Sequence, residues 1–133
     1  NNYMDKAKYQ VKINEGHLDF FGHVNNAKYL ELYEEARWDF INKVGQGIEY
    51  IKKVQKGPVV LGLSIKFKKE LFNQDEITIY SNVTGQKSSK IIILNQRMER
   101  GDGELISTVD IEIGLMDLKE RKLITPDKNR VWL

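Results

Sequence analysis

Hydrophobic and polar residues alternate near the start of the chain and then change to a helical spacing. Within residues 8–13, Tyr9, Val11 and Ile13 alternate with polar residues, which predicts a strand with one solvent-facing side. From residue 26 to residue 44 the apolar positions recur every three or four residues, at Tyr29, Tyr33, Ala36, Phe40 and Val44. This spacing predicts one long amphipathic helix.

Most of the chain after the helix has the alternation of strands. It predicts a strand over Val59–Lys68 and three more over Ile77–Thr84, Lys90–Arg100 and Leu105–Met116. The short polar links between them favour antiparallel neighbours. A short helix over Ile48–Val54 and a hairpin within Met116–Asp127 complete the prediction. One strand, a long helix and then four strands predict a single α+β domain over residues 1–133, with the helix on one face of an antiparallel sheet.

Composition narrows the possible functions. The 133 residues include no cysteine, which excludes disulfides, a thiol nucleophile and cysteine-ligated zinc. A formal charge of +2 is too small to indicate a nucleic-acid partner, and the apolar runs are too short to cross a membrane. We therefore expect a cytoplasmic protein with neither partner. Because a sheet of this kind leaves unpaired edges, we also expect a homo-oligomer, a dimer at least.

Both histidines and an aspartate lie just before the long helix, at His17, Asp19 and His23. The free backbone N–H groups at a helix start form a positive end, which suits a carbonyl oxygen that becomes an oxyanion. These groups would belong to Val24, Asn25 and Asn26. A carboxylate beside them can attack a thioester carbonyl or remove a proton from water that does so. The arrangement is therefore suited to acyl transfer.

The same residues also have structural interpretations. Asp19 can cap the backbone amides of its own turn, and Gly22 can supply a positive φ. Asn25 and Asn26 are common helix caps, and His23 can be a packed side chain. Tyr29 and Tyr33 can simply belong to the core.

Two other chemistries are less consistent with the sequence. His17, Asp19 and His23 form the ligand set of a non-haem iron site, but they crowd one loop instead of coming from separate rigid strands. We therefore predict no metal site. The sequence also has no Walker-type loop, no G-x-G-x-x-G motif and no G-x-S-x-G motif, which excludes the common nucleotide-binding and serine-hydrolase folds.

The stretch from His17 to Asp39 resembles the signature of hotdog-fold acyl-CoA thioesterases of the 4-hydroxybenzoyl-CoA thioesterase-like family, especially the long-chain acyl-CoA branch. The resemblance is carried by "EEARWD" at residues 34–39 and by Asp19, Gly22, His23, Val24, Asn25, Asn26, Tyr29 and Leu30. It implies a five-stranded antiparallel sheet wrapped around one long central helix, with active sites between the subunits of a dimer or tetramer.

The resemblance also implies roles for individual residues. Asp19 matches the catalytic aspartate, nucleophile or general base, and the amide of Asn26, with that of Val24 or Asn25, matches the oxyanion hole. His23 is expected to contact the carbonyl or a water, whereas His17 receives no role. Further substrate contacts are expected from Gly22, Tyr29 and Tyr33.

Coenzyme A is expected to be the group that carries the acyl chain, as part of the substrate and without a separate cofactor. Its phosphates need cations, and the predicted turn at Lys87, Ser88, Ser89 and Lys90 offers them. The segment Lys66–Lys69 is a weaker candidate for phosphate binding. For the turn at residues 87–90, the structural alternative is a solvated turn that binds no ligand. Two other functions stay open, a thioesterase acting on carrier-protein-linked acyl groups and a non-catalytic acyl-CoA binding module. The acyl length cannot be read from the sequence.

Overall fold

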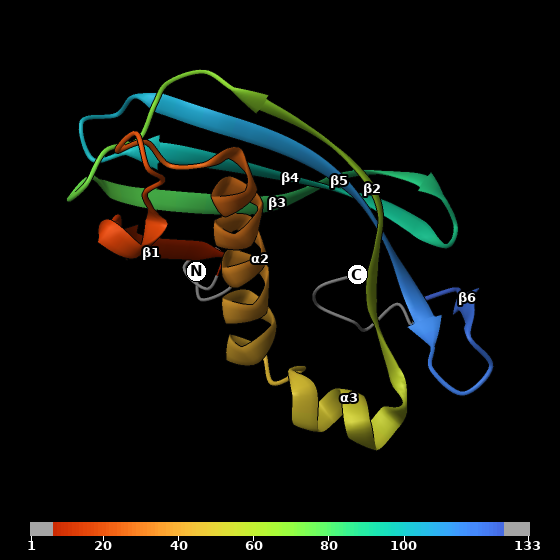
Figure 1. The fold of residues 1–133 in the computed structure, drawn as a ribbon. Helices are drawn as coiled ribbons and strands as arrows, with labels where there is room; N and C mark the ends of the chain where they lie inside the picture. Colours follow the sequence, from red (N-terminus) through yellow and green to blue (C-terminus); the bar gives the residue numbers. More distant parts are fainter. Residues whose placement is uncertain (1–6, 127–133) are drawn as a thin grey trace.

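The computed structural model describes residues 7–126, which form a strongly curled antiparallel sheet with two α-helices (Figure 1). The strands run in the order β1-β3-β4-β5-β2 across the sheet, and β6 pairs with β5. All pairs are antiparallel, as predicted, and the short links join neighbouring strands from β3 to β4 and from β4 to β5. The prediction is wrong for the link between β2 and β3, because the chain crosses the sheet there and β2 pairs with β5 instead. The elements are β1 (Lys8–Lys12), a 3₁₀ helix (Glu15–His17), α2 (Asn26–Lys43), α3 (Ile48–Val54), β2 (Lys56–Phe67), β3 (Glu76–Ser88), β4 (Ile91–Arg100), β5 (Leu105–Asp117) and β6 (Lys122–Ile124).

The sheet contains six strands in the described chain, one more than the five that the resemblance implied. The extra strand is β6, which covers only three residues. It forms because β5 continues past β4: Gly114 is the last β5 residue paired with β4, and the next three pair with β6. The predicted terminal hairpin is therefore present, with its second strand ending at Ile124, whereas Asp127 lies outside the described residues.

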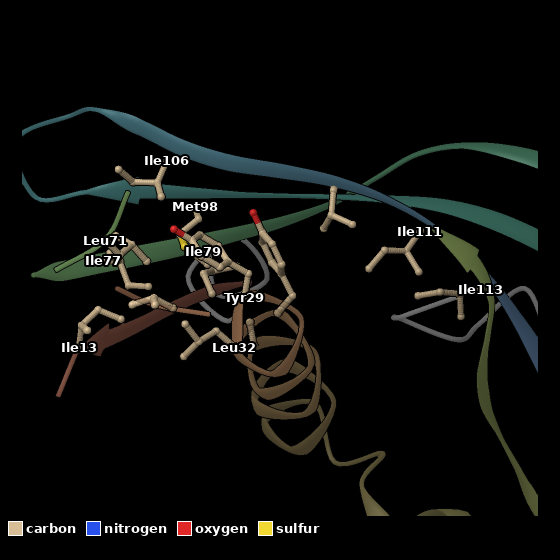
Figure 2. Close-up of a cluster of buried hydrophobic side chains, with 14 of the residues drawn as sticks. Ile13, Tyr29, Leu32, Leu71, Ile77, Ile79, Met98, Ile106, Ile111 and Ile113 are labelled. Atoms are coloured by element: carbon tan, nitrogen blue, oxygen red, sulfur yellow. The ribbon is translucent and has the colours of Figure 1, made fainter. Parts of the chain in front are cut away.

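Helix α2 lies against the concave side of the sheet (Figure 1). Its bounds agree with the predicted helix to within one residue. Only one stripe of it is buried, because Leu30 and the glutamates face outward. The buried positions are Tyr29, Leu32, Tyr33, Ala36 and Ile41. The first four of these residues pack against inward-facing residues of β3, β4 and β5, and together they form the core shown in Figure 2.

Two polar side chains of the described chain are fully buried, Ser107 of β5 and Gln96 of β4. Gln96 makes three hydrogen bonds. Its Nε2 donates to the carbonyl oxygen of Tyr33 over 3.1 Å and to Oγ of Ser81 over 3.0 Å, and its Oε1 accepts from Nη1 of Arg37 over 3.0 Å. All three contacts tie α2 or β3 to the centre of the sheet.

The predicted turn at residues 85–89 is shorter than expected. β3 continues to Ser88, so Lys87 and Ser88 lie on a strand instead of in a turn. Two register shifts, after Val83 and after Gln86, keep this polar end of β3 paired with β4. Its side chains are exposed, and the polar composition that suggested a turn is therefore compatible with a strand end.

Candidate active site

The loop before α2 is closed by Asp19. Its Oδ1 accepts from the backbone N–H of Phe21 over 2.9 Å and of His23 over 3.1 Å, while its own N–H donates to the carbonyl oxygen of His23 over 2.7 Å. Gly22 has a φ of 80°, the conformation expected for it. Asp19 therefore caps backbone amides of its own turn, as its structural interpretation predicted. Its side chain is nevertheless exposed, and its Oδ2 accepts no hydrogen bond from any residue that the structure describes.

The N-terminus of α2 lies beside this loop. Asn25 is the N-cap, and its Oδ1 accepts from the N–H of Ala27 over 2.8 Å. The backbone N–H of Asn26 donates to no group within residues 7–126. It is therefore available at the positive end of a helix of 18 residues. Asn25 thus has a structural role, whereas the amide of Asn26 can bind an anion.

Asp19 and the helix start border one open cleft of about 600 Å³, which we call the Asp19 cleft. Its walls come from the loop, from the first turn of α2 and from the end of β2 with the residues after it. The lining residues are Asp19, Phe21, His23, Val24, Asn25, Asn26, Tyr29, Phe67, Lys68, Lys69 and Glu70. Six of the residues predicted for catalysis or substrate binding are therefore brought together at one cleft.

The two tyrosines predicted as substrate contacts have different positions. Tyr29 lines the cleft, its hydroxyl donates to the carbonyl oxygen of Lys69 over 3.4 Å, and its ring lies edge-on to Phe67. Burial raises the pKa of Tyr29. Tyr33 is fully buried in the core, is absent from the cleft wall, and has a pKa raised more strongly by the same cause. Tyr33 therefore belongs to the scaffold, while Tyr29 anchors the segment after β2 to the helix.

His23 has an acidic neighbour that the sequence did not indicate. Its Nδ1 lies 3.1 Å from Oε1 of Glu70, within ion-pairing distance although without the alignment of a full hydrogen bond. Its ring also lies 6.0 Å from the ring of Phe72. Glu70 and Phe72 follow β2, far from His23 in sequence. No local spacing could have revealed them.

His17 stabilises the chain instead of lining the cleft. Its Nδ1 accepts from the backbone N–H of Asn14 over 2.9 Å, while Oδ1 of Asn14 accepts from the N–H of Gly16 over 2.8 Å. This is a capping box at the start of the 3₁₀ helix. No group of three or more histidine, aspartate or glutamate side chains in the described chain is placed to hold a metal ion. The alternative set of His17, Asp19 and His23 therefore does not assemble.

The residues predicted to bind coenzyme A lie far from Asp19 within one chain. The cleft adjoins the sheet near Phe67, whose neighbours across the sheet are Ser107, Met98 and Ile79 in turn. Ser88 is nine residues further along β3, which corresponds to roughly 30 Å of strand. Lys87 also forms an ion pair with Glu112 over 2.7 Å. By contrast, Lys68 and Lys69 line the cleft itself.

Comparison with known proteins shows to which family this fold and this cleft belong. Residues 11–131 match the thioesterase-like superfamily, and the chain belongs to that superfamily. Its family and its relatives are thioesterases, hydrolases that act on thioester bonds, and its fold is of the hotdog type. No α-helix among residues 7–126 is both long and apolar enough to cross a membrane.

Three individual relatives illustrate the similarity. The chain is 32% identical to the long-chain acyl-CoA thioesterase FadM of Escherichia coli K12 over 116 residues, 86% of each chain. Its structure is also similar to the crystal structure of the probable thioesterase YbaW from Escherichia coli, with a TM-score of 0.76. The two sequences are 30% identical, and the match covers 89% of this chain and 88% of that one. The Staphylococcus aureus protein SAV2348, solved in complex with CoA, shares the fold at 16% identity, with a TM-score of 0.84 and coverage of 92% and 77%.

Proposed function

We propose that the protein hydrolyses acyl-CoA thioesters, releasing a fatty or aromatic acid and CoA, and that the reaction takes place in the Asp19 cleft. The observation that carries this proposal is the meeting of a carboxylate and an unpaired helix-start amide at one cleft. The 32% identity to a long-chain acyl-CoA thioesterase supports the substrate class. We expect the enzyme to act in the cytoplasm and to require no separate cofactor.

The geometry supports a simple order of events. The thioester carbonyl oxygen would lie against the amide of Asn26, assisted by that of Val24 or Asn25. Attack by water forms a C–O bond at the carbonyl carbon, and the water proton passes to Asp19. The negative charge moves to the carbonyl oxygen, where the helix-start N–H groups stabilise it. The C–S bond then breaks, and sulfur leaves with its electron pair and takes up the proton as the free thiol. Direct attack by Asp19 is the second route, through an anhydride that water then hydrolyses.

Two features favour a dimer as the active form. The edge strand β2 exposes Val60, Leu61, Leu63 and Phe67, and apolar residues along a free edge favour pairing with a second copy. In one chain the Lys87–Lys90 segment is also too far from Asp19 to reach the same CoA molecule. If this segment binds the phosphates, it must do so for the partner's cleft. Lys68 and Lys69 are the alternative within the same chain.

The decisive experiment is replacement of Asp19 by asparagine, followed by thiol release from acyl-CoA. The carboxamide oxygen can still accept from Phe21 and His23, so the loop is expected to keep its conformation. We expect the rate to fall at least ~10²-fold while acyl-CoA binding persists. A loss below about tenfold would contradict the role of Asp19. Binding without turnover by the wild-type protein would instead identify a non-catalytic binding module.

The substrate and its binding groups are tested in a second experiment. Wild-type enzyme is assayed with acyl-CoAs of increasing length, one aromatic acyl-CoA and the same acyl groups on carrier protein. A preference for the carrier-linked substrates would indicate the carrier-protein function. A K87A/K90A variant is compared with K68A/K69A: the pair that binds the CoA phosphates should raise KM and leave kcat almost unchanged.

A further inference from the structure

We propose that Glu70 is a positioning residue for hydrolysis, acting through His23. The proposal rests on the proposed thioesterase activity of the Asp19 cleft. Glu70 Oε1 and His23 Nδ1 are 3.1 Å apart, and both residues line this cleft. The contact joins the loop before α2 to the segment after β2, two parts of the chain that share the cleft wall.

The contact determines which ring nitrogen of His23 is available. Nδ1 is shielded from solvent, although the side chain of His23 as a whole is 42% exposed. The exposure therefore belongs to the rest of the ring, which borders the cleft. An acidic oxygen beside Nδ1 favours the tautomer with its proton on that nitrogen. Nε2 is then left without a proton and can accept a hydrogen bond from a molecule in the cleft.

A hydrogen-bond acceptor at this position suits the attacking water. A water whose two hydrogens are accepted, one by Asp19 and the other by Nε2 of His23, directs a lone pair to the carbonyl carbon. The proton on the Asp19 side is transferred as the C–O bond forms, while the other hydrogen stays on the oxygen. The general-base route needs such a water in its first step. In the anhydride route Asp19 carries the acyl group when water attacks, so Nε2 of His23 alone can accept from that water.

The position of Glu70 is itself fixed by the backbone around it. The N–H groups of Lys68 and Lys69 both donate to the carbonyl oxygen of Ile106, over 2.9 and 3.2 Å, and the carbonyl oxygen of Lys69 accepts from the Tyr29 hydroxyl. Two residues later, the N–H of Phe72 donates to Oδ2 of Asp75 over 2.9 Å. The segment is thus held on both sides of Glu70, although the Glu70 side chain is 64% exposed. Such exposure is unfavourable for a stabilising ion pair but compatible with a role at a cleft wall.

The test is a double-mutant cycle on thiol release, using the variants E70Q, H23A and H23A/E70Q. The matched control is E104Q, since Glu104 lies in the exposed turn between β4 and β5 and its described hydrogen bonds involve only its backbone. We expect E70Q to lower kcat at least about tenfold, with KM changed less than about twofold and thermal stability equal to that of E104Q. We expect H23A/E70Q to be no slower than H23A, because Glu70 acts only through His23.

Two results would overturn the proposal. One is an E70Q variant as active as E104Q, and the other is the same fold loss from E70Q in the wild-type and H23A backgrounds. Either would leave the proposed function intact if wild type were active and D19N inactive. Failure of the D19N experiment would instead remove the activity on which the role of Glu70 rests.

Discussion

The Oδ1 atom of Asp19 accepts a hydrogen bond from the backbone N–H of His23, four residues later, over 3.1 Å. The same oxygen accepts from Phe21, so one carboxylate oxygen holds the loop while Oδ2 is left to the cleft. The structural and catalytic interpretations of Asp19 are therefore compatible, because each can use a different oxygen. Any change that opens this loop should displace Asp19 and His23 together.

Gly22 provides a test of that coupling. Its φ of 80° disfavours side chains, but a Cβ there would meet no atom within 4 Å. We expect Gly22→Ala to cost about 1 to 2 kcal/mol of folding stability and to lower thiol release, because relaxation of the strain moves Asp19. Gly103→Ala is the matched control, with a φ of 89° and equally open surroundings far from the cleft. Thermal unfolding should show similar losses for both variants, and equal activities would contradict the coupling.

Gln96 is predicted to be the most sensitive polar position of the core. Gln96→Leu would leave Nη1 of Arg37 without the acceptor that Gln96 provides, whereas the carbonyl oxygen of Tyr33, inside α2, would lose only its second hydrogen bond. Burial already lowers the pKa of Arg37, because water solvates its charged guanidinium poorly there, and water is a poor substitute for the lost hydrogen bond. We expect a loss of about 1 to 3 kcal/mol in denaturant unfolding, since that is the cost of one buried polar group left unpaired. Asn95→Leu, on the other face of β4, should change stability far less.

The sequence indicated those features that depend on neighbouring residues. The spacing of Tyr29, Tyr33 and Ala36 located α2, and Asn25 marked its start. The cluster at Asp19 likewise lies within one loop. Contacts between distant segments could not be read this way, as the Glu70 and His23 pair shows. The same limit applies to strands, whose ends depend on partners: β6 exists because β5 leaves a free edge, and β3 continues because β4 pairs with it.

The proposed dimer predicts a specific effect at the edge strand. Leu63 of β2 is 44% exposed, and a charge there would be buried by a second copy that pairs with this edge. We expect Leu63→Glu to shift the protein toward monomer in analytical ultracentrifugation and to lower thiol release. Ile48→Glu, at an exposed position on α3, is the control that should leave the assembly unchanged. A monomeric Leu63→Glu variant with full activity would show that one chain forms a complete site.

Asp117 gives a prediction for the pH dependence of stability. Its Oδ1 accepts from the N–H groups of Glu120 and Lys119, each over 2.9 Å, and with the nearby charges of Lys56 and Lys119 these bonds lower the pKa of Asp117. Because the folded state holds the ionised form more strongly, this stabilisation is present above the usual aspartate pKa of about 3.9. It is lost as the pH falls through the lowered value in the folded state.

Asp117→Asn should therefore lower the thermal midpoint at pH 7, and the difference from wild type should narrow steadily below pH ~4. The carboxamide oxygen can still accept from the turn, so the loss reports the charge more than the hydrogen bonds. Glu104→Gln, in a turn of the same sheet, is the control at each pH. A difference between Asp117→Asn and wild type that stayed constant from neutral to strongly acidic solution would show that the carboxylate charge does not stabilise the β5–β6 turn.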